Sequence, residues 1–345
     1  MLNFELLKRL CETPGVPGRE EQIRAVVTDA LNPLVDELST DVMGNVIGVK
    51  RGVDGPTIMI AAHMDEIGFI VKHVDDKGFL RVQPLGGFDP RNLIAQRVYV
   101  HCHTGEVLLG AFMPSAEGPD ADRSKARKLT DLFIDLGLPA DEVKSKVELG
   151  DPVTMARTCE KLGDMVVSKS LDNRLSVFVM IEAIRQMSAS RCTILAVATV
   201  QEEVGLRGAL PAAYALNPDI GIALDVTIAK DYPGGSEPER VTQLGKGTAI
   251  KIMDSSLICD PRLVKDFRRV AESHSIPYQL EILAAGGTDA GAIQRSRGGV
   301  PSFTLSTPTR YIHTVNETAA VADIEASINL LSAWLEEAHQ LNLTR

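Results

Sequence analysis

Two adjacent glutamates directly follow an apolar stretch of the chain and are the first candidates for chemistry. Residues 194–201 (ILAVATVQ) are rich in Ile, Leu, Val and Ala, which predicts a strand buried on both faces. Glu202 and Glu203 end that strand, and Gly205 and Gly208 allow a tight turn before a helix-like segment. Neighbouring strand residues point to opposite faces, so one carboxylate could bind a metal ion while the other transfers protons. A solvated acidic pair at a loop edge is the alternative.

Other strand ends and loop starts carry similar polar residues. The full set of candidate metal ligands is His63, Asp172, Glu203, Asp225 and His313. Two imidazoles and three carboxylates, without thiolates, suit zinc, cobalt or manganese, and the excess of carboxylate suits two cations that share a bridging ligand. Asp172 is the natural bridge, because it opens a predicted helix whose N-terminus favours an anion.

Each candidate also has a purely structural alternative. A single histidine is more often a structural residue, Asp225 could cap a turn, and Glu203 could pair with Arg207 at helical spacing. The metal hypothesis rests on the joint pattern, because all the candidates fall at the same predicted edge of the sheet. Asp65 supports it, since it follows His63 by two residues and could accept the second ring N–H of that imidazole.

A glycine-rich segment provides a candidate substrate site. The residues that we expect to line it are Gly286, Gly287, Thr288 and Asp289. The glycines would let the backbone approach a bound peptide, although a structural turn explains the same residues.

The order of the predicted elements indicates an α/β scaffold interrupted by a small β-rich domain. We expect a catalytic domain at 1–69 and 165–345 and an inserted, barrel-like dimerisation domain at 70–164. In the scaffold, helices are predicted at 1–35 (two, broken at 14–18), 173–187, 206–216, 261–274 and 324–338, and buried strands at 57–62, 192–200, 220–226, 248–254, 279–285 and 300–307. Short alternating segments predict antiparallel strands in the insertion, whose one helix candidate is 131–147.

Composition excludes several classes of function. The formal net charge of −10 argues against a nucleic-acid or anionic-membrane surface. The charged N-terminal segment lacks the apolar core of a signal peptide, and no apolar run approaches the length of a membrane span. Five scattered cysteines with no C-x-x-C pair indicate reduced thiols. We therefore expect a cytoplasmic protein.

Six motifs in order resemble the tetrahedral aminopeptidases, a metallopeptidase family that includes the glutamyl aminopeptidases. They are AAHMDEIGF (61–69), LDNR (171–174), VQEEVGLRGA (200–209), ALDV (223–226), GGTDAGA (286–292) and RYIHT (310–314). The resemblance covers nearly the whole chain. It implies an α/β, zinc-peptidase-like catalytic domain with a mixed sheet and helices on both faces, interrupted by the β-rich domain.

The resemblance also implies roles for the candidate residues. His63 and Asp225 would hold one divalent cation, Glu203 and His313 a second, and Asp172 would bridge the two. Glu202 would be the general base, and Asp65 joins it as a candidate catalytic residue. The expected substrates are peptides that lose their N-terminal residue. The expected assembly is a homo-oligomer, a dodecamer built from dimers.

One departure from the family pattern lies in the inserted domain. Family members often have a Pro-Pro-His stretch where this chain has FMPSAE at 112–117. Because this loop is outside the catalytic domain, the departure concerns assembly contacts or channel shape and not the metal site.

Three alternatives remain open at this point. A deacylase of N-acyl amino acids could use the same metals. A glycoside hydrolase, a label carried by some members of the family, needs a free carboxylate pair and usually aromatic platforms. The chain has one Trp and only 4% aromatic residues. The third alternative is a non-catalytic peptide-binding protein on the same fold. The preferred N-terminal residue and the native metal also stay open.

Overall fold

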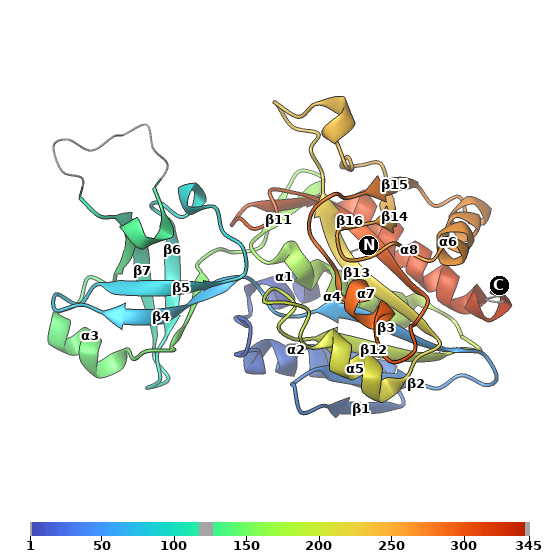
Figure 1. Cartoon of the computed structure of the whole chain (residues 1–345), viewed down its shortest axis with the longest axis horizontal. Helices are drawn as coiled ribbons and strands as arrows, with labels where there is room; N and C mark the ends of the chain where they lie inside the picture. Colours follow the sequence, from blue (N-terminus) through green and yellow to red (C-terminus); the bar gives the residue numbers. More distant parts are fainter. Residues whose placement is uncertain (1, 117–126, 342–345) are drawn as a thin grey trace.

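A large mixed sheet forms the centre of the α/β portion of the molecule (Figure 1). The computed structural model describes residues 2–116 and 127–341, and in these residues the sheet has 11 strands. They are β1 (Glu37–Thr40), β2 (Val46–Lys50), β3 (Thr57–His63), β10 (Glu160–Leu162), β11 (Met165–Ser168), β12 (Thr193–Thr199), β13 (Ile220–Ile228), β14 (Thr248–Met253), β15 (Tyr278–Ile282), β16 (Ser302–Arg310) and β17 (Glu317–Ala320). The main order is β1-β2-β12-β3-β13-β16-β17-β11-β10, and β14 pairs with β15 and β16.

Four neighbouring strands at the centre of the sheet run in the same direction. β12 pairs in parallel with β3, β3 with β13, and β13 with β16. Their carboxyl ends therefore meet along one edge of the sheet, which is where ligands bind in open α/β sheets. This topology is the one that the sequence-based prediction required, because it lets the candidate residues that follow these strands share one edge.

Helices cover both faces of the sheet, as predicted. The α/β portion contains α1 (Phe4–Glu12), α2 (Glu21–Leu31), α4 (Leu171–Gln186), α5 (Ala209–Leu216), α6 (Pro261–Ser273), α7 (Asp289–Gln294) and α8 (Val321–Glu337). Alternate residues of β3 enter different cores: Ile58 and Ile60 join the core under α1, α2, α4, α6 and α8, whereas Met59 and Ala61 pack with α5 and α7. This alternation explains why the strand sequence is apolar throughout.

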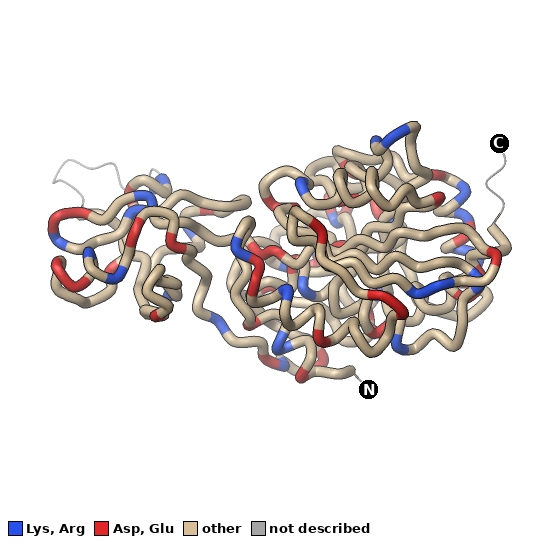
Figure 2. Tube along the Cα trace, turned by 90° about the horizontal axis from the view of Figure 1, so that it is seen from below, with Lys and Arg blue, Asp and Glu red and all other residues tan. Residues whose placement is uncertain are grey.

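A six-stranded closed barrel forms a second lobe beside the α/β portion (Figures 1 and 2). Its strands, in the order β4-β5-β8-β7-β6-β9, are β4 (Gly68–Val74), β5 (Leu80–Leu85), β6 (Arg97–His101), β7 (Val107–Pro114), β8 (Leu132–Asp135) and β9 (Pro152–Met155), and α3 (Ala140–Lys146) packs on it. Both lobes carry interspersed acidic and basic residues (Figure 2). Isolated 3₁₀ turns lie at Asn32–Leu34, Pro90–Asn92, Leu129–Asp131, Glu237–Glu239 and Ala338–Gln340.

The helix predicted at 131–147 is wrong over its first half. Leu132 and Ile134 are buried and alternate with more exposed neighbours, and their segment pairs antiparallel with β7 as strand β8. The period of two is a strand pattern, and Gly137 and Pro139 then separate it from the short helix α3. The domain limits at 69/70 and 164/165 stay a prediction; the barrel strands span Gly68–Met155, and β10 already pairs with the large sheet.

The described cysteines are all free and buried. No helix in the parts of the chain that the structure describes has the length and apolarity needed to cross a bilayer. The cytoplasmic location inferred from the thiols stays a prediction.

Candidate metal centre

The parallel strands bring most of the candidate residues to one place. His63 is the last residue of β3, and Glu202 and Glu203 follow the end of β12. Asp225 lies on β13, and His313 lies in the loop between β16 and β17. Each side chain is thus carried by, or directly follows, a central strand, and the buried sheet fixes the backbone from which it projects.

Asp172 comes from the other side of the site, at the start of α4. Asp172 and Asn173 have non-helical backbone angles and are joined by a cis peptide bond, so regular helix begins only after them. The side-chain amide of Asn173 donates to the carbonyl of Leu224 at 2.9 Å, which ties this segment to β13 beside Asp225. The predicted helix-opening position of Asp172 is therefore a short turn that presents its carboxylate to the strand ends.

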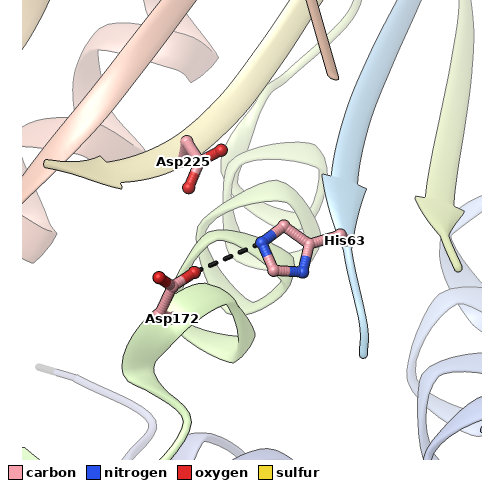
Figure 3. Close-up of side chains that lie close together, drawn as sticks. All are labelled: His63, Asp172 and Asp225. Atoms are coloured by element: carbon pink, nitrogen blue, oxygen red, sulfur yellow. Dashed lines mark ion pairs between the residues drawn. The ribbon is translucent and has the colours of Figure 1, made fainter. Parts of the chain in front are cut away.

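The two oxygens of Asp172 face different imidazoles. Oδ1 lies 3.2 Å from His63 Nε2, and Oδ2 lies 3.4 Å from His313 Nε2. Figure 3 shows Asp172 and His63 pointing toward one another, with Asp225 above them on its strand. A carboxylate that presents one oxygen to each side has the geometry of a bridging ligand.

Two groups of potential metal ligands share Asp172. The first is His63, Asp172 and Asp225, and the second is Asp172, Glu203 and His313; in each group the candidate ligand atoms lie within 4.8 Å of one another. The structure therefore brings the five candidate ligands together around Asp172, and their assignment to two cations stays a prediction. Glu202 belongs to neither group, although its Oε2 is 3.7 Å from His63 Nε2.

Asp65 is fully buried beneath these groups and holds them in place. Its Oδ1 accepts the backbone N–H of Glu202 at 3.0 Å, and its Oδ2 accepts that of Glu203 at 3.1 Å. His63 Nδ1 lies 3.2 Å from the backbone carbonyl of Asp65 and 3.5 Å from its Oδ1. Because a carbonyl only accepts, Nδ1 carries the hydrogen in the neutral ring, and the lone pair of Nε2 faces Asp172.

The buried carboxylates and imidazoles of the centre shift one another's pKa values. Burial raises the pKa of Glu202 well above its usual range, and Asp225, Asp289 and Glu203 add to this while His63 opposes it. Burial lowers the pKa of His313, but its contacts with Asp172 and Glu203 outweigh burial and raise the pKa to about 11. The buried carboxylates thus favour the protonated form of His313.

The residues fit divalent cations. In residues 2–116 and 127–341, the carboxylates of Asp172, Glu202, Glu203 and Asp225 form no ion pair with Lys or Arg. Glu203 Oε1 is buried, has no hydrogen-bond donor among the described residues and lies 3.3 Å from His313 Nε2. Buried carboxylates need a positive partner, and this mixture of oxygen and imidazole nitrogen suits zinc, cobalt or manganese.

A cavity of about 610 Å³ opens onto the centre. Gly286, Gly287 and Thr288 line it together with the ligand residues, whereas Asp289 is absent from its lining. Asp289 is buried, accepts a hydrogen bond from the Thr199 hydroxyl, and has a pKa raised to about 6 by burial. Three of the four predicted substrate residues therefore border the cavity, and the fourth is buried against Thr199.

Sequence reasoning missed the buried charges behind the ligands. Glu66 accepts hydrogen bonds from Lys169 and from the Ser170 hydroxyl, and Arg174 lies 3.7 Å from Glu66. Glu317 accepts the backbone N–H groups of two candidate ligands. The one available signal was position, since Lys169 and Arg174 flank Asp172 and Glu66 follows Asp65 in sequence.

Comparison with known proteins identifies the family. The model of the M42 glutamyl aminopeptidase family matches residues 44–330. The chain belongs to this family. It is therefore a peptide hydrolase of the aminopeptidase type, which confirms the resemblance seen in the six sequence motifs.

Relatives of this M42 aminopeptidase match along its whole length. A putative aminopeptidase from Acetivibrio thermocellus is 43% identical over 95% of this chain and 97% of its own. The structure of an aminopeptidase from Desulfurococcus kamchatkensis superposes with a TM-score of 0.93 and 40% identity, covering 96% of this chain and 94% of its own. The structure of the TET1 peptidase of Pyrococcus horikoshii, described as assembling into a tetrahedron or a large octahedral shell, superposes with a TM-score of 0.86 and 31% identity. It covers 97% of this chain and 99% of its own. The fold and its inserted barrel are thus those of the tetrahedral aminopeptidases.

Proposed function

We propose that this chain is an aminopeptidase that activates water with two divalent cations. His63 and Asp225 would hold one cation, Glu203 and His313 would hold the other, and Asp172 would be shared by the two. The observation that carries the proposal is the pair of ligand groups that share Asp172. Zinc or cobalt suits these ligands best, and manganese is compatible with them.

When bound, two cations lower the pKa of a water molecule toward neutrality and polarise the scissile carbonyl. Glu202 accepts the proton of the attacking water and passes it to the leaving amine. Its carboxylate suits this role because it borders the cavity and lies outside both ligand groups. Asp65 positions Glu202 and Glu203 through their backbone N–H groups and keeps the His63 tautomer that can bind metal.

Selection for a free N-terminus requires a carboxylate that receives the substrate ammonium. Glu202 is available to receive the ammonium, because it lines the cavity and its carboxylate forms no ion pair with Lys or Arg among the described residues. Asp289 is a weaker candidate, since it lies outside the cavity lining and bonds to Thr199. An N-acetylated peptide is neutral at this position and loses the charge-assisted contact.

The cavity suits an apolar or acidic first residue better than a basic one. Its acidic lining residues are the four carboxylates of the metal centre, Asp172, Glu202, Glu203 and Asp225. The remaining wall includes Ile228, Leu283 and Ile312 and two lysines, Lys230 and Lys251. Lys251 is paired with Glu281, whereas Lys230 forms no ion pair in the described residues and can meet a carboxylate.

We also propose that the chain assembles into a closed homo-oligomer, a dodecamer built from dimers. The Pyrococcus horikoshii relative is described as assembling into a tetrahedron or a large octahedral shell, and the barrel here presents exposed apolar side chains. Tyr99 of β6 and Leu109 of β7 are a cross-strand pair on the outer face of the barrel, and Val107 and Met113 of β7 are also exposed. Such a patch is typical of an assembly surface. Of the FMPSAE loop, Phe112 to Pro114 belong to β7, and Glu117 lies outside the described residues.

Product analysis on matched substrates tests the function. A peptide with a free N-terminus, its N-acetylated counterpart and a cello-oligosaccharide are incubated with the enzyme loaded with Zn, Co or Mn. We expect stepwise release of single residues from the free peptide alone. Comparable cleavage of the acetylated peptide would indicate a deacylase or an endopeptidase, and metal-dependent sugar release would indicate a glycosidase. The single tryptophan, Trp334, is buried and offers no platform for a sugar.

A panel of aminoacyl chromogenic amides tests the preference for the first residue. Leucyl and glutamyl amides should be cleaved with higher kcat/KM than lysyl amides. Faster cleavage of the lysyl amide would show that the lysines of the cavity do not face the first side chain of the substrate.

A further inference from the structure

Glu317 is a buried carboxylate whose two oxygens are used by two different proposed ligands. Its Oε2 accepts the backbone N–H of Asp172 at 2.9 Å, and its Oε1 accepts the backbone N–H of His313 at 2.8 Å. The residue is only 1% exposed. One side chain thus joins two segments that are far apart in sequence and that both supply the second ligand group.

The sheet fixes the position of Glu317. It is the first residue of β17, and in the pairing of β17 with β11 it lies opposite Ser168, four residues before Asp172. The strand β17 also pairs with β16, which ends just before the loop that carries His313. A carboxylate on a paired strand therefore spans the gap between the two ligand segments, and strands hold such groups more rigidly than loops do.

The segments that Glu317 joins have unfavourable backbone conformations. His313 has φ 63° and Ser170 has φ 60°, both in the left-handed region, where residues with a Cβ are disfavoured. Tertiary contacts must hold such residues. The hydrogen bond from the His313 N–H to Glu317 fixes that peptide, and with it the direction of a ring whose Nε2 lies 3.4 Å from Asp172 Oδ2.

We propose that Glu317 is a positioning residue for the metal centre, setting the separation between the bridging carboxylate and His313. The inference rests on the proposed two-cation function. Glu317 belongs to neither ligand group, and both of its oxygens already accept backbone N–H groups. Asp65 makes the equivalent pair of bonds to Glu202 and Glu203 on the other side of the centre. Together the two carboxylates hold four of the residues that surround the cations.

A purely structural role is the competing explanation, and the chain offers a matched control for it. Asp323 is also fully buried, and its two oxygens accept the backbone N–H groups of Gly245 and Gly247, each at 2.7 Å. Neither glycine is a candidate ligand. Removing the Asp323 carboxylate should lower stability in the same way but should leave metal binding unchanged.

Metal binding by full-length protein tests the inference. Wild type, Glu317→Ala, Glu317→Gln and Asp323→Asn are stripped of metal, and Zn²⁺ affinity and stoichiometry are measured by competition with a chromogenic chelator. We expect Glu317→Ala to weaken Zn²⁺ binding by roughly 10–100-fold, the usual loss when a group behind a ligand is removed. Glu317→Gln retains one acceptor and should lose less. The visible spectrum of bound Co²⁺, which reports ligand geometry, should change in both Glu317 variants and not in Asp323→Asn.

The outcomes separate the inference from the proposed function. Wild-type protein that binds fewer than two cations refutes the dinuclear centre. Two cations in wild type, with unchanged affinity and Co²⁺ spectrum in the Glu317 variants, refute only the positioning role. An equal loss of affinity in Asp323→Asn also refutes it, because general destabilisation then explains the effect. If Glu317→Ala does not fold, the isosteric Glu317→Gln decides between these outcomes.

Discussion

The division of labour between the adjacent glutamates is the sharpest prediction. Glu202→Gln removes the proposed base but changes no member of either ligand group. General base catalysis contributes roughly 10²–10⁴ in rate, or about 2.7–5.4 kcal/mol of transition-state stabilisation. We therefore expect kcat to fall by that factor while both cations stay bound. Glu203→Gln, the same substitution one residue later, should instead lose metal.

The metal-free protein gives an independent readout of Glu202. Burial raises the pKa of this carboxyl well above its usual range, so the folded state binds its proton more tightly than the unfolded state does. Ionisation of Glu202 in the unfolded chain therefore lowers the stability of the metal-free fold as the pH rises above about 4.3, the ordinary glutamate pKa, and the loss grows until the pH passes the folded-state pKa. Metal-free Glu202→Gln should then be more stable than wild type at pH 8, and the difference should vanish near pH 4.

Three measurements check these expectations. They are kcat on a chromogenic amide, metal content after dialysis, and urea unfolding of chelator-treated protein at the two pH values. An active Glu202→Gln enzyme refutes the assignment of the base. Loss of metal in Glu202→Gln, or full metal content in Glu203→Gln, refutes the separation of the two roles.

Three further predictions follow from the structure. In Asp65→Asn, an amide NH2 replaces one carboxylate oxygen and cannot accept the hydrogen bond of a backbone N–H. The loss of one charge-assisted hydrogen bond, worth about 1.5–3 kcal/mol, should lower metal affinity roughly 10–150-fold in chelator competition. Protonated His313 stabilises the metal-free chain fully below about pH 6.5, and this contribution is lost as the pH rises through about 11, so the Tm of chelator-treated protein should fall between pH 7 and pH 10. A rising Tm would contradict the pairing of His313 with carboxylates. Light scattering should show a large assembly, weakened by Leu109→Ser without loss of metal; a 37.3 kDa monomer under all metal conditions would refute the closed shell.

Local sequence patterns were sufficient to predict the scaffold and to place several candidate residues at one edge of its sheet. Apolar runs such as 57–62 and 194–200 require strands that are buried on both faces, and such strands occur in parallel sheets covered by helices. Parallel strands place their carboxyl ends at one edge, so polar residues that follow different strands must meet there. His63, Glu203 and Asp225 could therefore be grouped before any coordinates were known.

Tertiary structure alone decided the features that depend on pairing between distant segments. Segment 132–135 is a strand because β7 offers it a partner, although its neighbours in sequence suggested a helix. Thr199 lies opposite His63 in the pairing of β12 with β3, and this register brings the Glu202 and Glu203 N–H groups onto Asp65. Glu317 reaches Asp172 only because β17 lies beside β11. Sequence periodicity reports which face of an element is buried, but it carries no information on which distant backbone N–H a buried carboxylate will meet, because that contact is set by the register between strands.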